Sequence, residues 1–374
     1  MPFLQRVFQS RPQDYLPSCL LLTTVALGSW GCGSEPAQVE AARSAGGDRS
    51  LRVVTTFLPI TSFTKAVVGD RAQVVQLLPP NLGPHDYQAK PEDVVKLQQA
   101  DVLVQNGLGI ESFLSSLLKN ADNPTLKVID TSAGIATLET AEAGSTGSQA
   151  SDADGQADHR HEDQGPEDQA HGNHDHGAEN PHIWLDPKRA IAQVETIRDG
   201  LVAADPAGKS IYTANAAAYI AKLKDLDAAF TAQMKPYQGK TFVTYHDFAD
   251  YFADSYGLQV EYLVGIPHES ATPQDVQRVI TAARDSNLQT LLTEPQAEGN
   301  PFAALAQDLR VSVGTFDPIE TGSPQALTPD YYLQRMQDNL KNLTRAFGRP
   351  TQRSSQGRFQ QIQLERQPLA TLNF

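Results

Sequence analysis

Short runs rich in β-branched residues alternate with helical stretches along this chain, and the alternation occurs twice, on either side of one unusually long helical stretch. Parallel strands need a crossover connection, so a strand, a helix and a further strand indicate a parallel unit. Each series therefore predicts a parallel, doubly wound sheet. The predicted strands are Val53–Phe57, Val74–Leu78, Val102–Asn106 and Lys127–Asp130, and then Thr241–Tyr245, Val260–Val264, Gln289–Thr293 and Val311–Phe316. The predicted helices are Ile60–Val68, Glu92–Gln99 and Glu111–Leu118, and then Phe248–Tyr256, Pro273–Ser286, Asn300–Asp308 and Pro329–Phe347.

Two helical stretches, Lys188–Ala203 and Ala207–Lys235, connect the two series. At 1.5 Å per residue the second would be about 40 Å long, which is enough to run along both halves of the molecule. We therefore predict an α/β fold with two doubly wound parallel-sheet lobes joined by a long rigid helix. Ligands of open α/β sheets bind at the carboxyl ends of the strands, so we expect the ligand site in the cleft between the lobes.

Residues 1–31 have the features of an export signal. Arg6 and Arg11 give it a positive start, and the apolar run Leu20–Leu27 is too short to span a bilayer. The small residues around Cys32 resemble a bacterial lipoprotein signal, in which the cysteine becomes the lipidated first residue of the mature chain. An ordinary cleaved signal, with Cys32 discarded, is the alternative. Both interpretations predict a periplasmic or otherwise extracytoplasmic protein, and only the lipoprotein interpretation gives it a membrane anchor, at Cys32.

The chain has two cysteines, Cys19 and Cys32, and Cys19 lies inside the predicted signal. The mature protein would therefore carry at most one cysteine, which excludes a disulfide framework and a thiolate metal site. Any soft-metal site must then use histidine and carboxylate side chains. The formal net charge of −14 argues against a nucleic-acid partner, because phosphate binding needs a basic surface.

The segment between Glu139 and Asn180 carries no Val, Ile, Leu, Met, Phe, Trp or Tyr. Such a segment cannot bury enough apolar surface to offset its chain entropy, so residues 139–180 are predicted to be a mobile, acidic, histidine-rich insertion. Flexible imidazoles bind zinc to some degree, so weak auxiliary metal binding is one interpretation and a solvated linker is the other. The histidines of the insertion are His159, His161, His171, His174 and His176.

Three histidines outside the insertion have positions that favour metal binding. His85 follows the second predicted strand, His246 follows the first strand of the second series, and His182 lies in the connection between them. Asp317 comes directly after the last predicted strand. Groups at the carboxyl ends of parallel strands reach the rim of a sheet, so the four residues converge if the two halves face each other. Three imidazoles and one carboxylate suit tetrahedral Zn²⁺, and nitrogen-rich ligation favours zinc over manganese.

Carboxylates near these histidines are candidates for a supporting role, because ligating histidines usually donate their other ring N–H to a carboxylate or a carbonyl. Each carboxylate could equally serve as a helix cap. The candidates are Asp86, Asp186, Asp247 and Glu294.

Several short motifs occur in a fixed order between about Val53 and Phe347. They are Pro84-His85-Asp86-Tyr87, Lys90-Pro91-Glu92-Asp93, Ala100-Asp101-Val102, Asn106-Gly107-Leu108-Gly109-Ile110-Glu111, Asn180-Pro181-His182-Ile183-Trp184-Leu185-Asp186-Pro187, Tyr245-His246-Asp247-Phe248, Thr293-Glu294-Pro295-Gln296 and Phe316-Asp317-Pro318. With these motifs the chain resembles the zinc-specific substrate-binding proteins of ABC transporters, the ZnuA-like family. The resemblance implies a non-enzymatic, monomeric receptor that captures Zn²⁺ and delivers it to the membrane permease of an ABC importer.

The resemblance also bears on the ligands. The family position of the third ligand carries His in zinc proteins and Glu in manganese relatives, and this chain has His246. Some zinc relatives have an acidic residue just before the first ligand, where this chain has Pro84. The expected ligand set is therefore His85, His182 and His246, with Asp317 or a water molecule as the fourth ligand.

Three other functions stay open at this point. A zinc metalloenzyme is disfavoured because no HExxH pair and no Ser or Cys nucleophile motif accompanies the histidines. A manganese or iron receptor of the same fold would differ in its metal preference, and a surface adhesin has no specific support in the sequence. The predicted organisation is an export signal at 1–31, a tether at 32–50, an N-terminal lobe at 51–138, the insertion at 139–180, connecting helices at 181–236, a C-terminal lobe at 237–348 and a polar tail at 349–374.

Overall fold

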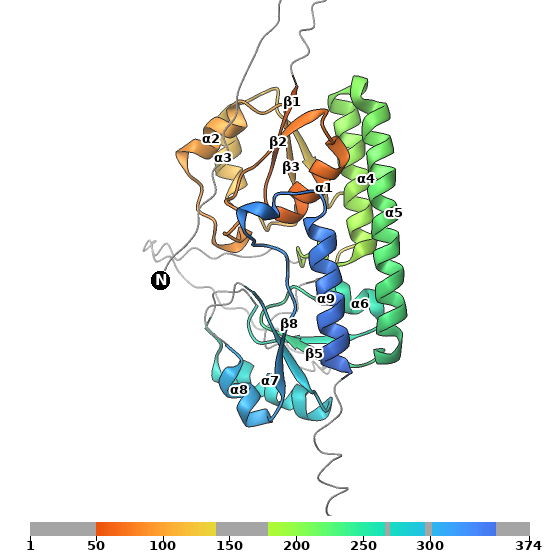
Figure 1. The fold of residues 1–374 in the computed structure, drawn as a ribbon. Helices are drawn as coiled ribbons and strands as arrows, with labels where there is room; N and C mark the ends of the chain where they lie inside the picture. Colours follow the sequence, from red (N-terminus) through yellow and green to blue (C-terminus); the bar gives the residue numbers. More distant parts are fainter. Residues whose placement is uncertain (1–49, 140–178, 266–269, 296–300, 349–374) are drawn as a thin grey trace, which may run out of the picture. The chain divides into compact units, whose positions relative to one another are not determined.

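The computed structural model describes residues 50–139, 179–265, 270–295 and 301–348, and these residues form two four-stranded parallel sheets (Figure 1). The strand order is β2-β1-β3-β4 in one sheet and β6-β5-β7-β8 in the other, so the two sheets have the same topology. In each sheet the second strand lies on one side of the first strand and the third strand lies on the other. This arrangement confirms the predicted fold of two doubly wound α/β lobes.

The N-terminal lobe is built around the first sheet. Val53, Val54 and Leu103 are buried in it, as expected for parallel strands that are covered by helices. Helix α2 begins at a proline, and the carboxylate of Asp93 accepts the backbone N–H of Lys90 at 2.9 Å, which caps the first turn. The elements are β1 (Leu51–Thr55), α1 (Leu58–Val68), β2 (Ala72–Gln76), α2 (Pro91–Gln98), β3 (Val102–Gln105), α3 (Leu114–Ala121) and β4 (Lys127–Asp130).

The C-terminal lobe is built around the second sheet. Phe242, Val243 and Leu291 form its buried centre. Helix α7 also begins at a proline, and the hydroxyl of Thr272 accepts the backbone N–H of Asp275 at 3.2 Å. The elements are β5 (Thr241–Thr244), α6 (Asp250–Tyr256), β6 (Gln259–Tyr262), α7 (Pro273–Asp285), β7 (Thr290–Thr293), α8 (Ala303–Leu309) and β8 (Ser312–Thr315).

Helices α4 (Pro187–Ala204) and α5 (Lys209–Met234) pack side by side, and α5 joins the two lobes (Figure 1). Helix α5 has 26 residues, which corresponds to a length of about 39 Å. Near its start, Nδ2 of Asn215 donates a hydrogen bond to the carbonyl of Val67 in α1 at 3.1 Å. Near its end, the ring of Phe230 lies 5.1 Å from that of Phe252 in α6. One continuous helix therefore packs against both lobes.

The chain also returns to the N-terminal lobe after β8, before it forms α9 (Tyr331–Phe347). The backbone N–H of Gly322 donates to the carbonyl of Pro80 at 2.6 Å, and Nζ of Lys65 donates to the carbonyl of Leu327 at 2.7 Å. A Cβ atom at position 322 would lie 2.7 Å from the hydroxyl of Tyr331, so this close approach needs glycine. Residues 316–330, which we call the return segment, are thus a second connection between the lobes, besides α5.

The element boundaries differ from the predicted ones by a few residues, and β1 and β2, for example, begin and end two residues earlier than predicted. The helix expected from Glu111 begins later, at Leu114, because the carboxylate of Glu111 accepts the backbone N–H groups of Asn106 and Gly107 at 2.7 and 3.1 Å. Among the described residues, no helix combines the length and the apolar character that a membrane crossing requires.

Candidate metal centre

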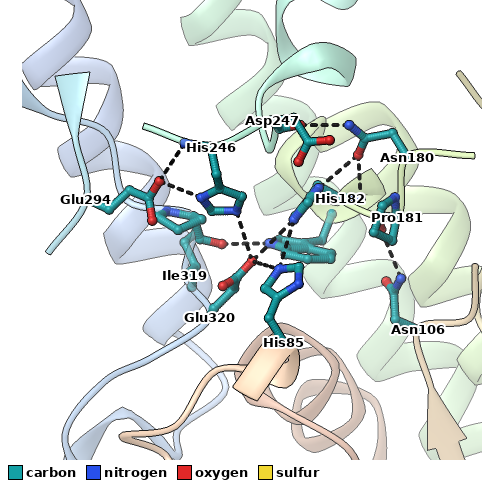
Figure 2. Close-up of polar contacts among 12 residues, drawn as sticks. His85, Asn106, Asn180, Pro181, His182, His246, Asp247, Glu294, Ile319 and Glu320 are labelled. Carbon is teal, nitrogen blue, oxygen red and sulfur yellow. Dashed lines mark hydrogen bonds and ion pairs between the residues drawn. The ribbon is translucent and has the colours of Figure 1, made fainter. Parts of the chain in front are cut away.

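Four side chains from four separate segments meet between the lobes (Figure 2). They belong to His85, His182, His246 and Glu320, and one ligand atom of each lies within 4.8 Å of the others. His182 and His246 are 1% and 0% exposed, and the side chains of His85 and Glu320 are each 2% exposed. Among the residues that the structure describes, this is the group of His, Cys, Asp and Glu side chains that could hold a metal ion.

The distances within the group match a small tetrahedral site. Oε1 of Glu320 lies 3.2 Å from Nε2 of His85, 3.3 Å from Nε2 of His182 and 3.7 Å from Nε2 of His246. The Nε2 atoms of His85 and His182 are 3.4 Å apart. A tetrahedral zinc ion with bonds of 2.0–2.1 Å separates its ligand atoms by about 3.3–3.4 Å. The four side chains are therefore spaced as ligands of one Zn²⁺ ion would be.

The topology explains how these side chains meet. His85 lies in a short 3-10 helix, Pro84–Asp86, that follows β2, and His246 follows β5 directly. Glu320 follows β8, and His182 precedes a second short 3-10 helix, Ile183–Leu185, before α4. Three of the four residues thus come from the carboxyl ends of parallel strands, and the fourth comes from the connection between the lobes. The structure brings together the three histidines that were expected to converge.

Asp317, the expected fourth ligand, is not a member of this group, which contains Glu320 instead. Oδ1 of Asp317 accepts the backbone N–H of Ile319 at 2.7 Å, so this carboxylate caps the turn that follows β8. The turn then directs Glu320 toward the histidines (Figure 2). In the sequence, Glu320 lies three positions after Asp317 in the same loop and could have been considered as a ligand. It was overlooked because Asp317 stands directly after the strand.

The turn before Glu320 has an unusual backbone. Ile319 has a φ of 65° and is fully buried. This left-handed conformation costs about 1–2 kcal/mol for an L-residue, and β-branched residues rarely adopt it. Surrounding contacts therefore hold the turn that presents Glu320.

His182 is oriented by Asn180, which is fully buried. Oδ1 of Asn180 lies 2.9 Å from Nδ1 of His182 and also accepts the backbone N–H of His182 at 3.0 Å. Because an amide oxygen only accepts, Nδ1 of His182 carries the proton and Nε2 faces the group with a lone pair. Nδ2 of Asn180 donates to the carbonyl of Asp247 at 2.7 Å, which connects this histidine to the segment that carries His246 (Figure 2).

His246 is oriented by a carboxylate, Glu294, which follows β7. Nδ1 of His246 donates to Oε1 of Glu294 at 2.5 Å. Glu294 was among the carboxylates considered for this role, whereas Asp186 accepts from Nη1 of Arg189 at 2.7 Å and from Oγ of Ser255 at 2.8 Å. Nε2 of His246 therefore also points into the group.

The buried charges affect the protonation of the group. Burial lowers the pKa of His182 to about 3, so its imidazole is neutral. Burial also opposes a charge on His246, but the carboxylates of Glu294 and Glu320 outweigh it and raise the pKa of His246 to about 10. Burial alone would raise the pKa of Glu320, but the surrounding histidines hold it well below its ordinary value. The group thus offers an ionised carboxylate, with a proton on His246 that a metal ion must displace.

Comparisons with known proteins agree on one family. The family model described as "Zinc-uptake complex component A periplasmic" matches residues 53–346. The high-affinity zinc uptake system protein ZnuA of Bacillus subtilis is 29% identical over 330 residues, which cover 88% of this chain and 94% of that protein. The zinc-binding lipoprotein AdcA of Streptococcus pneumoniae is 30% identical over 304 residues, which cover 79% of this chain and 56% of AdcA. The chain thus matches little more than half of the length of AdcA.

A solved structure supports the same relationship. The crystal structure of the Zn(II)-bound ZnuA-like domain of Streptococcus pneumoniae AdcA matches with a TM-score of 0.61 and 28% sequence identity. The match covers 80% of this chain and 99% of that domain.

Proposed function

This chain belongs to the family of periplasmic zinc-uptake components, ZnuA, and from this premise we propose that it captures Zn²⁺ and delivers it to an ABC-type importer. The observation that carries the proposal is the buried group of three imidazoles and one carboxylate, with ligand atoms within 4.8 Å of one another. The relatives named as zinc-binding or zinc-uptake proteins support the choice of metal. The cargo ion would enter the space that these four side chains enclose.

We propose His85, His182, His246 and Glu320 as the ligands, with Glu320 in place of Asp317. Three nitrogen atoms and one oxygen atom suit Zn²⁺, whereas manganese prefers more oxygen ligands and a higher coordination number. The distances between the ligand atoms of these four side chains, which are close to those of a tetrahedral zinc site, support the same choice. No observation in the described residues favours a manganese or iron receptor.

We also propose that the protein is not an enzyme. A catalytic zinc site uses three protein ligands and keeps one position open for water. Here four protein ligands would fill the tetrahedron, and their side chains are almost completely buried. A site with four protein ligands and no open position favours a protein that holds the ion and passes it on over an enzyme that uses the ion in catalysis.

The fold supports release by a partner rather than by spontaneous opening. Helix α5 and the return segment, which is bonded to Pro80 through Gly322, both connect the lobes. Two connections limit the rotation of one lobe against the other. We therefore propose that the membrane permease of an ABC transporter distorts the site, and that the receptor acts as a monomer outside the cytoplasmic membrane without binding nucleic acid.

The export signal, the tether, the candidate anchor Cys32 and the polar tail lie outside the described residues, and their predicted roles and boundaries remain proposals. The same holds for the five insertion histidines, His159, His161, His171, His174 and His176, which we propose as weak auxiliary zinc ligands.

The proposed function is tested by titrating the metal-free mature protein with Zn²⁺ and Mn²⁺ in competition with a chelator. We expect one tight Zn²⁺ site that Mn²⁺ does not fill at equal concentration. We expect His85→Ala, His182→Ala and His246→Ala each to lower the Zn²⁺ affinity of that site. The loss should exceed the roughly 10–100-fold that is typical when a residue that only hydrogen-bonds to a metal ligand is replaced. Tighter binding of Mn²⁺ than of Zn²⁺ would refute the choice of cargo.

A further inference from the structure

The turn that carries Glu320 holds a conformation that its own sequence does not favour. Ile319 has a φ of 65°, and its side chain is fully buried. A β-branched residue in this region is an outlier, because its Cβ crowds the backbone. Such strain persists only where surrounding contacts over-determine it, and it is concentrated at ligand sites. The contacts around the turn therefore indicate what sets the position of Glu320.

One of these contacts comes from α9. Oδ1 of Asn339 accepts the backbone N–H of Asp317 at 2.9 Å, and Nδ2 of Asn339 donates to the carbonyl of Asp317 at 2.8 Å. Asn339 is 1% exposed, so both bonds are shielded from water. A single amide thus holds both polar backbone groups of the residue at which the turn begins.

The other contact comes from the segment that carries His182. Nε1 of Trp184 donates to the carbonyl of Pro318 at 2.8 Å, and this carbonyl belongs to the peptide that precedes Ile319. The ring of Trp184 is fully buried and lies 5.2 Å from the ring of His182. The hydroxyl of Tyr332 donates to the carbonyl of Trp184 at 2.6 Å, which fixes the tryptophan backbone. Trp184 therefore contacts one ligand ring directly and the turn of another ligand through a hydrogen bond.

We propose that Trp184 and Asn339 are positioning residues that hold the strained turn at Ile319, and thereby keep the Glu320 carboxylate within coordination distance of the three histidines. This inference rests on the proposed zinc-binding function and extends it to selectivity. Without either contact, the turn relaxes toward an ordinary backbone conformation and the carboxylate retracts. The site then becomes three imidazoles with solvent, which binds Zn²⁺ less tightly and no longer enforces tetrahedral geometry.

The test uses the full mature protein and the variants Trp184→Phe, Glu320→Gln and their combination. Phenylalanine keeps an aromatic ring beside His182 but lacks the N–H that donates to Pro318. We expect Trp184→Phe to weaken Zn²⁺ binding about tenfold, in line with the effect of outer-shell partners. In the Glu320→Gln background, Trp184→Phe should cause little further loss of Zn²⁺ affinity. The effects of the two substitutions are not additive if Trp184 acts through Glu320.

A spectroscopic measurement separates positioning from a general loss of packing. Tetrahedral Co²⁺ absorbs strongly in the visible range, and octahedral Co²⁺ absorbs weakly. We expect Co²⁺-loaded Trp184→Phe to lose intensity relative to the wild-type protein. A matched control, Tyr212→Phe, removes the partly buried 2.8 Å hydrogen bond from Tyr212 in α5 to Asp205, and it should alter neither the affinity nor the spectrum.

Asn339→Asp provides an independent variant in case Trp184→Phe does not fold, which thermal unfolding of the metal-free protein would reveal. It keeps the acceptor for the N–H of Asp317 but places an oxygen against the carbonyl of Asp317. We expect a similar loss of affinity that also disappears in the Glu320→Gln background. Wild-type affinity in the folded variants, or an equal loss with and without Glu320, would overturn the inference. Failure of the wild-type protein to bind Zn²⁺ would instead refute the proposed function.

Discussion

Oε1 of Glu294 accepts two hydrogen bonds from His246, one from Nδ1 at 2.5 Å and one from the backbone N–H at 3.2 Å. A single carboxylate thus fixes both the ring and the backbone of the histidine. The contact leaves Nε2 of His246 to face the metal centre and makes the imidazole a stronger electron donor. The charge of Glu294 also offsets part of the positive charge that Zn²⁺ would bring into this buried space.

Replacing Glu294 with Gln tests this relationship. The amide keeps an oxygen acceptor for His246 but removes the negative charge. We expect Zn²⁺ affinity to fall about 10–100-fold. The pKa of His246, which the carboxylates raise to about 10, should move back toward the ordinary imidazole value. Titration calorimetry in buffers of different ionisation enthalpy at pH 8 should then show fewer protons released per zinc ion.

The control for this variant is Glu261→Gln. Glu261 lies on β6 and faces Arg278 at 3.3 Å rather than an imidazole. Affinity and proton release should stay at wild-type values. If Glu294→Gln matches this control, the carboxylate does not support the ligand as described.

The pH dependence of zinc binding follows from the same groups. His182, with its pKa lowered to about 3, is already neutral near pH 7 and releases no proton there. His246, with its pKa raised to about 10, is protonated in the metal-free protein and must lose its proton to bind the ion. We expect the dissociation constant to rise about tenfold for each unit by which the pH falls below 8. A constant affinity between pH 6 and pH 8 would contradict this assignment.

As the pH rises, zinc affinity should increase, whereas the stability of the metal-free protein should decrease. A histidine with a raised folded-state pKa stabilises the fold fully below its unfolded value of about 6.5, and this stabilisation is lost as the pH rises through the folded-state value. Thermal unfolding of the metal-free protein should therefore shift to lower temperature between pH 7 and pH 9, while the zinc-loaded protein does not follow. The Glu294→Gln variant should lose most of this pH dependence.

The choice of Glu320 over Asp317 as the fourth ligand gives a paired prediction. Glu320→Gln removes the one carboxylate within the group, and we expect Zn²⁺ affinity to fall by more than the roughly 10–100-fold of outer-shell changes. Asp317→Asn keeps an Oδ1 acceptor for the N–H of Ile319 and should leave the affinity within about threefold. Competition titration of both variants against one chelator measures the difference. The reverse ranking would restore Asp317 as the ligand.

The outcome at these two positions illustrates what could be predicted from the sequence. The alternation of β-branched runs and helical stretches is a local signal, and it was sufficient for both sheets and for α5. The positions of His85 and His246 followed from the rule that ligand groups lie at the carboxyl ends of parallel strands. Glu294, directly after β7, was accessible by the same reasoning.

Glu320 also follows a strand, but this rule did not single it out over Asp317, because its direction depends on a backbone conformation that the local sequence disfavours. The φ of 65° at Ile319 is held by Asn339, 22 residues from Asp317, and by Trp184, 134 residues from Pro318. These contacts form only when α9 and the segment before α4 pack against the turn, so a local sequence pattern does not reveal them. A sequence pattern can therefore predict a carboxylate that is positioned by the end of a strand. It does not predict the direction of a carboxylate that is positioned by long-range contacts.

Gly322→Ala tests whether the return segment supports the site. The added Cβ would lie 2.7 Å from the hydroxyl of Tyr331 and 2.8 Å from Cβ of Ala326, so the segment must shift. We expect the free energy of unfolding to fall by about 1–3 kcal/mol, as is typical of overpacking. Zn²⁺ affinity should fall as well, because Glu320 lies two residues away in the sequence. Denaturant unfolding and zinc titration of the same preparation measure both effects.

Gly83→Ala is the matched control for this variant. A Cβ there would meet its nearest neighbour, Oε2 of Glu320, at an ordinary contact distance of 3.5 Å. We expect a small change in stability and an affinity close to that of the wild-type protein. An unchanged affinity in Gly322→Ala, despite a measured loss of stability, would show that the return segment does not determine the position of Glu320.

The insertion can be removed at a defined point, because its two flanks lie side by side. Glu139 and Glu179 form an antiparallel bridge, and the backbone N–H of Asn180 donates to the carbonyl of Leu138 at 2.8 Å. The N–H of Leu138 in turn donates to the hydroxyl of Tyr251 at 3.1 Å. Residues 140–178 can therefore be replaced by a two-residue Asn-Gly turn, which suits adjacent antiparallel segments.

We expect this deletion to leave the fold and the tight zinc site unchanged, because Asn180, which orients His182, keeps its contacts to Leu138 and Asp247. Zinc binding beyond one equivalent should disappear, since the deleted segment contains five histidines. Calorimetric titration of the deletion variant and the full-length mature protein distinguishes the two classes of site. A matched control replaces those five histidines with Gln in the full-length chain and should give the same stoichiometry. Loss of the tight site in the deletion but not in the Gln variant would mean that the flanking bridge needs the intact insertion in order to hold Asn180 in place.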